Sequence, residues 1–121
     1  FKTLLQFSCC VKVITKKASF SLKKLVGKSK ITLQVREFKD SDLKKFNVVY
    51  ACTDNAALNR RIAFLAKKQS ILFNIAGNAK LSNFISPAIY KNKKIIISVT
   101  TSGENPKRAV RIRNKIQELC Q

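Results

Sequence analysis

The chain has 121 residues and is 45% hydrophobic, which leaves room for one domain with one core. Its 25 basic and 6 acidic residues give a formal net charge of +19 at pH 7, which suits nucleic acid, an anionic membrane surface or a polyanionic small molecule. The sequence has no apolar run long enough to span a bilayer and no signal-peptide pattern, so no membrane partner is expected.

The first third of the chain predicts short elements around a long basic segment. We expect the end of a helix over residues 1–7, a short strand over 11–14 and an irregular, lysine-rich segment over 16–30. Residues 31–35 alternate apolar and polar side chains, which is typical of a strand with one face in water. A short helix is predicted over 41–46, with Asp40 or Ser41 as its cap.

The middle of the chain carries the strongest pattern. Residues 47–52 form a near-continuous apolar run, typical of a parallel strand that is covered on both faces. Residues 55–68 predict a helix with one apolar stripe, formed by Leu58, Ile62, Leu65 and Ala66. A second buried strand is expected over residues 71–75.

The last third predicts a mixed connection over residues 78–90, a strand over 94–99 and a final helix. Asn105 caps this helix, and Pro106 stands at its first position, where a missing N–H costs nothing. Its inner face is expected to consist of Ala109, Ile112, Ile116 and Leu119. Because strands alternate with helices, the predicted fold class is α/β, with a mostly parallel sheet and helices on both faces.

The four cysteines give no sign of a metal site. They are Cys9, Cys10, Cys52 and Cys120; no CxxC pair occurs, and the chain has no histidine. We therefore expect no bound metal. We interpret the cysteines as small hydrophobic residues of a protein in the reducing cytoplasm.

Several motifs follow one another in a distinctive order along the chain. They are Thr53-Asp54-Asn55, Leu58-Asn59-Arg60-Arg61, Asn74-Ile75-Ala76-Gly77-Asn78, Asn83-Phe84-Ile85-Ser86-Pro87-Ala88 and Ser98-Val99-Thr100-Thr101-Ser102-Gly103-Glu104-Asn105-Pro106. Together they resemble the N-terminal module of siroheme synthase, the precorrin-2 dehydrogenase and sirohydrochlorin ferrochelatase family. The resemblance covers essentially the whole chain.

The resemblance implies a fold, an activity and partners. Residues 1–77 would form a Rossmann-like NAD-binding domain, and residues 78–121 would begin the dimerisation and tetrapyrrole-binding region of a homodimer. The activity would be NAD-dependent dehydrogenation of precorrin-2 to sirohydrochlorin in siroheme (porphyrin) biosynthesis. Ferrous iron would enter only as a substrate, in members that also insert it. A basic surface would suit the polycarboxylate tetrapyrrole, although compositional drift toward Lys, Asn and Ile would give the same charge.

The resemblance also implies cofactor-binding residues, namely Thr15, Lys16, Lys17, Thr53 and Asp54. The family's Gly-rich loop would lie upstream of Phe1, where we expect the true N-terminus of a longer protein. No acid occurs at residues 15–17 to hold the ribose hydroxyls, and Lys16 and Lys17 would also suit a 2′-phosphate, so NAD and NADP both remain candidates. The alternatives are a solvated loop for the two lysines and a helix cap for Asp54.

Gly77 is the sharpest departure from the family pattern, because it stands where the family has a carboxylate that acts as general acid and base. The loss threatens iron insertion more than hydride transfer, since chelation needs proton removal from pyrrole nitrogens whereas hydride transfer depends mainly on the cofactor. The catalytic residue is therefore unknown. An alternative function is that of a catalytically impaired tetrapyrrole-binding paralogue or carrier.

Six residues match family positions at the tetrapyrrole pocket and are candidate substrate-binding residues: Asn74, Gly77, Asn83, Thr101, Ser102 and Asn105. Ser102 replaces a family glycine, and Asn105 replaces the family's cap serine. For Thr101 the alternative is a capped turn, which is compatible with ligand binding. A basic nucleic-acid-binding domain is a further alternative that only the charge motivates.

Overall fold

The computed structural model describes residues 3–26 and 31–120, and these form two compact units, Phe1–Asp42 and Leu43–Gln121. The predicted helix end over 1–7 and the basic segment over 16–30 therefore extend partly outside the described residues. Within the described ranges, no helix is both long and apolar enough to cross a bilayer.

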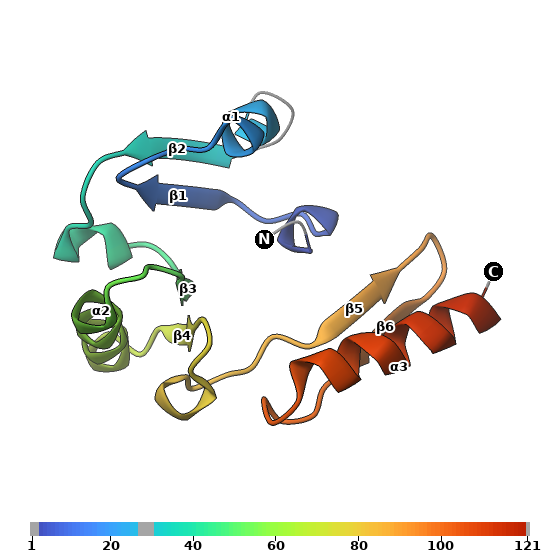
Figure 1. The fold of residues 1–121 in the computed structure, drawn as a ribbon. Coiled ribbons are helices and arrows are strands. Elements are labelled where there is room, and N and C mark those ends of the chain that lie inside the picture. Colours follow the sequence, from blue (N-terminus) through green and yellow to red (C-terminus); the bar gives the residue numbers. More distant parts are fainter. Residues whose placement is uncertain (1–2, 27–30, 121) are drawn as a thin grey trace. The chain divides into compact units, whose positions relative to one another are not determined.

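The first unit is built on two parallel strands (Figure 1). Strand β1 (Val11–Thr15) pairs with β2 (Ile31–Val35) so that Thr15 lies opposite Val35, and both strands end at the same edge. A 3-10 turn, η1 (Leu4–Gln6), precedes β1, and helix α1 (Phe20–Val26) packs against β2. Two parallel strands must be joined by a crossover connection, and α1 lies on the connection between β1 and β2.

Helix α1 corrects the prediction of an irregular segment over residues 16–30. The helix starts after Ser19, whose side-chain oxygen accepts a hydrogen bond from the backbone N–H of Leu22 at 3.2 Å. The many lysines hid this cap and the short apolar face that follows it. The predicted helix over 41–46 is likewise replaced by a 3-10 turn, η2 (Asp40–Leu43), and the positive φ of 70° at Lys45 prevents its continuation.

The second unit begins with a second parallel pair. Strand β3 (Val48–Ala51) pairs with β4 (Leu72–Ile75), and helix α2 (Ala56–Lys68) connects them and packs on both. The predicted stripe of α2 is confirmed, since Ile62 and Ala66 are buried and Leu58 and Leu65 are half-buried. Together with Ala51, Phe73 and Ile75, this stripe forms the core of the unit.

The remainder of the second unit is a hairpin with a helix. After η3 (Ala79–Leu81), strands β5 (Ala88–Lys91) and β6 (Ile96–Val99) pair antiparallel, and α3 (Pro106–Leu119) packs on both. The end of the predicted connection over 78–90 is thus a strand. Only four residues separate β5 from β6, too few for a crossover, so this pair departs from the expected parallel order.

The predictions for α3 are confirmed except at its end. The Asn105 side chain accepts a hydrogen bond from the backbone N–H of Arg108 at 2.9 Å, and Pro106 follows as predicted. Ala109 is buried and Ile112 and Ile116 are half-buried. Leu119, predicted on the same face, is 87% exposed, because it is the last helical residue before the C-cap.

Candidate functional site

The turn that follows β3 is held by a buried amide. Asn59, on the first turns of α2, is 8% exposed; its Nδ2 donates to the Thr53 carbonyl at 2.9 Å and its Oδ1 accepts from Thr53 Oγ1 at 2.6 Å. The Thr53 hydroxyl oxygen in turn accepts a hydrogen bond from the backbone N–H of Asn55 at 3.2 Å. These bonds fix the path of the chain from β3 into α2.

The helix cap at this turn is Asn55, which corrects the interpretation of Asp54 as the cap. Asn55 Oδ1 accepts a hydrogen bond from the backbone N–H of Leu58 at 3.0 Å. A cap must directly precede the first helical residue, and Asp54 stands one position too early. Asp54 is exposed on the turn, beside the start of α2.

The free edge of β4 is covered by side chains rather than by another strand. Asn83 accepts from the backbone N–H of Phe73 through Oδ1 at 2.7 Å, and its own backbone N–H donates to the Phe73 carbonyl at 3.0 Å. Ser82 Oγ accepts from the backbone N–H of Ile75 at 2.9 Å. The segment over residues 82–84 is therefore fixed along β4, opposite β3.

Three further contacts tie residues 84–86 to the strands. Asn74 Nδ2 donates to the Phe84 carbonyl at 3.0 Å, and the rings of Phe84 and Tyr50 meet edge to face with centroids 5.6 Å apart. The Tyr50 hydroxyl lies 2.9 Å from Ser86 Oγ. Strands β3 and β4 and the segment over 83–86 thus form one polar and aromatic cluster.

The two described positive-φ glycines of this region behave differently. Gly77, directly after β4, has a φ of 73°, and a Cβ added there would meet no atom within 4 Å. Gly103 has a φ of 82°, and its Cβ would come within 2.8 Å of Ala79 Cβ and 3.2 Å of Ile85 Cδ1. The close approach at Gly103 brings the turn before α3 against the segment that follows β4.

The turn before α3 is organised by hydroxyls. Thr100 Oγ1 accepts from the backbone N–H of Ser102 at 3.1 Å, and Thr101 Oγ1 accepts from that of Asn105 at 3.0 Å. Among residues 3–26 and 31–120 the Thr101 hydroxyl donates to no acceptor, so its hydrogen is available to a ligand. Ser102, exposed with a φ of 54°, adopts the backbone conformation that favours glycine.

At the carboxyl end of β1, the other predicted cofactor residues form a separate turn. Thr15 Oγ1 donates to the Lys17 carbonyl at 2.8 Å, and the backbone N–H of Arg36, after β2, donates to the Thr15 carbonyl at 2.9 Å. The exposed Lys16 pairs with Glu37, with 2.8 Å between Nζ and Oε1. The hydrogen bond from Lys16 lowers the pKa of the Glu37 carboxyl below its usual value.

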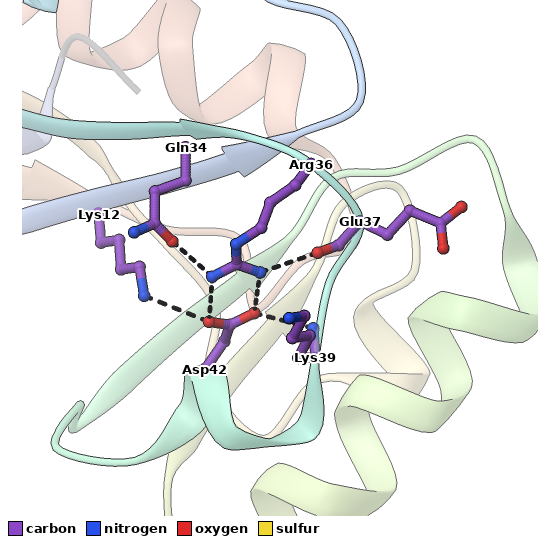
Figure 2. Close-up of polar contacts among 6 residues, drawn as sticks. All are labelled: Lys12, Gln34, Arg36, Glu37, Lys39 and Asp42. Atoms are coloured by element: carbon purple, nitrogen blue, oxygen red, sulfur yellow. Dashed lines mark hydrogen bonds and ion pairs between the residues drawn. The ribbon is translucent and has the colours of Figure 1, made fainter.

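A charge network lies beside this turn (Figure 2). Both oxygens of Asp42 bind Arg36, Oδ1 to Nη2 at 2.6 Å and Oδ2 to Nη1 at 2.8 Å, and Lys12 Nζ lies 3.2 Å from Oδ1. Asp42 Oδ2 also accepts from the backbone N–H of Lys39 at 2.8 Å, while Arg36 reaches Gln34 as well. The Arg36 hydrogen bond is the main cause that holds the pKa of Asp42 well below its usual value.

The structure brings the predicted site residues together in two groups. Within the second unit, the turns after β3 and β4 carry Thr53, Asp54 and Gly77, the β4 edge carries Asn74 and Asn83, and the turn before α3 carries Thr101, Ser102 and Asn105. Thr15, Lys16 and Lys17 lie in the first unit. Ligand contact by each of these residues stays a prediction.

Sequence reasoning missed Glu37, Asn59, Ser82 and Gly103. Glu37 and Gly103 take their roles from neighbours distant in sequence, so local patterns gave no signal for them. Asn59 had one available signal, because a lone amide on the apolar stripe of α2 needs a buried hydrogen-bond partner.

The residues present fit a dinucleotide. Polar turns follow the carboxyl ends of β1 and β2 in the first unit and of β3 and β4 in the second, and the carboxyl ends of parallel strands are where α/β folds bind such ligands. The turn after β1 offers Lys16 and Lys17, and the turn after β3 leads into the 13-residue helix α2. Across residues 3–26 and 31–120, no group of three or more His, Cys, Asp or Glu side chains is arranged to hold a metal ion.

The chain has clear relatives. It is 33% identical to siroheme synthase of Nitrosococcus oceani over 90% of this chain and 23% of that protein, and 32% identical to siroheme synthase of Pseudoalteromonas atlantica over 96% of this chain and 25% of that protein. The chain therefore spans about a quarter of the length of these curated relatives.

A solved structure and a family model agree on the fold. The structure titled "SirC, precorrin-2 dehydrogenase" superposes with a TM-score of 0.75 at 20% identity, over 98% of this chain and 57% of that one, which confirms the predicted Rossmann-like α/β fold. The model of the family described as "Putative NAD(P)-binding" matches residues 1–88. With most of its length matched by that model, the chain belongs to this NAD(P)-binding family.

Proposed function

We propose that this chain is part of an enzyme that dehydrogenates precorrin-2 to sirohydrochlorin with NAD. It would supply the dinucleotide-binding part of that enzyme and the start of its tetrapyrrole-binding part. The observation that carries the proposal is the meeting of the turn before α3 with the segment after β4 at Gly103, in a chain about one third identical to siroheme synthases. That meeting places the turn before α3 against the segment that follows the parallel strand β4, and folds of this kind bind their ligands at the carboxyl ends of parallel strands.

The bound nicotinamide dinucleotide would accept the hydride from the substrate. The residues of this chain would bind and orient it: Thr15, Lys16 and Lys17 on the adenosine side, and Thr53 with Asp54 at the start of α2. The clasp between Asn59 and Thr53 supports this assignment, because it fixes the turn before any ligand arrives. NADP is the competing cofactor.

The tetrapyrrole carboxylates would bind at the turn before α3. The Thr101 hydroxyl has a hydrogen to donate, and Ser102 is exposed beside it. Asn74 and Asn83 would shape the pocket wall, since their amide nitrogens donate to backbone carbonyls. We also propose a cytoplasmic homodimer formed through the region over 78–121, which is supported by the exposed apolar side chains of Ile95, Ile96 and Val110. Light scattering across a dilution series tests the dimer.

Gly77 favours a second candidate function, that of a tetrapyrrole-binding protein without catalysis. Because a Cβ at residue 77 would meet no atom within 4 Å, packing does not exclude a carboxylate here, which supports the proposal that glycine has replaced the family's general acid and base. Iron insertion depends on proton removal and would suffer most. Dehydrogenation places less demand on a protein carboxylate.

The test is anaerobic NADH formation from precorrin-2 and NAD by the full-length protein, with tetrapyrrole binding measured in parallel. Turnover by the parent protein supports the dehydrogenase. Tetrapyrrole binding without turnover, with activity appearing in Gly77→Asp, supports the carrier. A protein that binds neither tetrapyrrole nor dinucleotide contradicts both functions.

A further inference from the structure

The carboxyl edge of the β1–β2 sheet contains an acid that the first strand lacks. In dinucleotide-binding folds, an acidic side chain at such an edge accepts hydrogen bonds from the adenosine ribose. Residues 15–17 provide none, but Glu37, two residues past the end of β2, pairs with Lys16 at 2.8 Å. The loop after β2 thus supplies a carboxylate next to the lysines that follow β1.

The backbone around Glu37 is held on both sides by the charge network. Arg36 Nη1 donates to the Glu37 carbonyl at 2.8 Å, and Asp42 accepts from the backbone N–H of Lys39. Figure 2 shows the Glu37 carboxylate directed away from Asp42, and its side chain is 77% exposed. The network therefore presents this carboxylate to solvent from an ordered loop, available to a ligand.

The charges at this edge are divided between two acids. Asp42 pairs with Arg36 and Lys12, and Glu37 pairs with Lys16. Among the described contacts, Lys17 is the cation of the β1 turn that has no acidic partner. A 2′-phosphate would need both lysines and would meet the Glu37 carboxylate next to one of them. A 2′-hydroxyl would find an acceptor in that same carboxylate.

We propose that Glu37 determines which nicotinamide dinucleotide this chain accepts, by accepting a hydrogen bond from the ribose 2′-hydroxyl of NAD and opposing the 2′-phosphate of NADP. The inference rests on the proposed dinucleotide-binding function and names its specificity residue. Lys16 is its counterpart, because its ammonium group pairs with Glu37 and a 2′-phosphate would compete with Glu37 for that pairing.

The test compares dissociation constants of NADH and NADPH, measured by nucleotide fluorescence, for the full-length protein and Glu37→Gln. The variant should shift the ratio of the two constants roughly tenfold toward NADPH. Adding Lys16→Gln to this variant should remove the gain for NADPH. The matched control is Glu118→Gln, an exposed glutamate on α3 that changes the net charge equally.

Each result decides the matter. A shift confined to Glu37→Gln and reversed by Lys16→Gln supports the proposal. An unchanged ratio, or the same shift in Glu118→Gln, overturns it while leaving the proposed function intact if the parent protein binds NADH. Failure of the parent protein to bind either nucleotide overturns both. Circular dichroism confirms that each variant is folded before the comparison.

Discussion

The two compact units hold their functional turns by different chemistry. In the first unit, the loop after β2 is fixed by ionised groups, with Asp42 between Arg36 and Lys12. In the second unit, the turn after β3 and the edge of β4 are fixed by neutral side chains, chiefly Asn59 and Asn83. Charge fixes a loop strongly but depends on pH, whereas neutral amides give the same geometry at any ordinary pH.

The difference also shows how a chain with 25 basic and 6 acidic residues uses its few acids. A buried carboxylate that pairs with several cations stabilises the fold more than an exposed one. The side chain of Asp42 is only 6% exposed, and it pairs with both Arg36 and Lys12. The second unit positions its turns without any acid in these roles. Variants of each unit should therefore respond differently to the loss of one side chain and to acid.

Asp42→Ala should have the largest effect. The variant leaves two cations and a backbone N–H without their common acceptor, and we expect a loss of about 3 kcal/mol in the free energy of unfolding. Urea unfolding measures the change. Glu118→Ala is the control and should change stability by less than about 0.5 kcal/mol. A loss below about 1 kcal/mol in Asp42→Ala would show that the network contributes little.

Acid should weaken the same network. The pKa of Asp42 is lowered in the folded protein, so its contribution is complete above the unfolded pKa of about 3.9 and is lost as the pH falls from there toward the folded value. Between about pH 5 and pH 2 the parent should lose roughly 2 kcal/mol through this group. Asp42→Asn should show a shallower decline over that range. Parallel profiles for the parent and the variant would argue against Asp42 as the source.

Gly103→Ala should cost about 2 kcal/mol, because the new methyl group would lie within 2.8 Å of Ala79 Cβ at a positive φ. Gly77→Ala is the matched control. It has a similar φ but open space, so only the backbone penalty of about 1 kcal/mol applies. Thermal unfolding of the two variants separates the clash from the backbone term. Equal losses would mean that the turn before α3 moves away from Ala79 without cost.

Asn59→Ala tests the neutral clasp directly. The variant removes two hydrogen bonds to Thr53 from a residue that is 8% exposed, and we expect a loss of about 1.5 kcal/mol. Asn114→Ala, at an exposed position of α3, is the control. Denaturant unfolding of Asn59→Ala at about pH 2 and pH 5 should give the same loss, in contrast to Asp42. A loss that depends on pH over this range would contradict the comparison of the two units.

The sequence predicted those features that depend on adjacent residues. The cap at Asn105, the helix over 55–68, the strands β1 to β4 and the order of the polar turns all follow from local pattern, whereas the cap of the helix over 55–68 was wrongly placed at Asp54 instead of Asn55. Helix α1 was not predicted, because an apolar helical pattern over only seven residues is hard to recognise in a segment rich in lysine. Strand β5 was missed because its pairing with β6 depends on a turn at Asn92.

The site was predictable as a set of turns but not as a set of contacts. Lys16 meets Glu37 across two strands, and Gly103 meets Ala79 and Ile85 across a hairpin, and no local period encodes either meeting. The sequence did single out Ser102 as a replacement of a family glycine. The structure supplies the physical meaning of that replacement, which is a positive φ of 54°.

Ser102→Gly should therefore have the smallest effect, and it should stabilise the protein. Releasing a non-glycine residue from this conformation gains about 1 kcal/mol, and the greater freedom of glycine in the unfolded chain offsets part of it, leaving about 0.5 kcal/mol. Ser98→Gly, in strand β6, lacks the positive φ and should instead destabilise by a similar amount. Thermal melts of the two variants should thus move in opposite directions. A loss of stability in both would mean that the Ser102 side chain contributes more to the turn than its backbone costs.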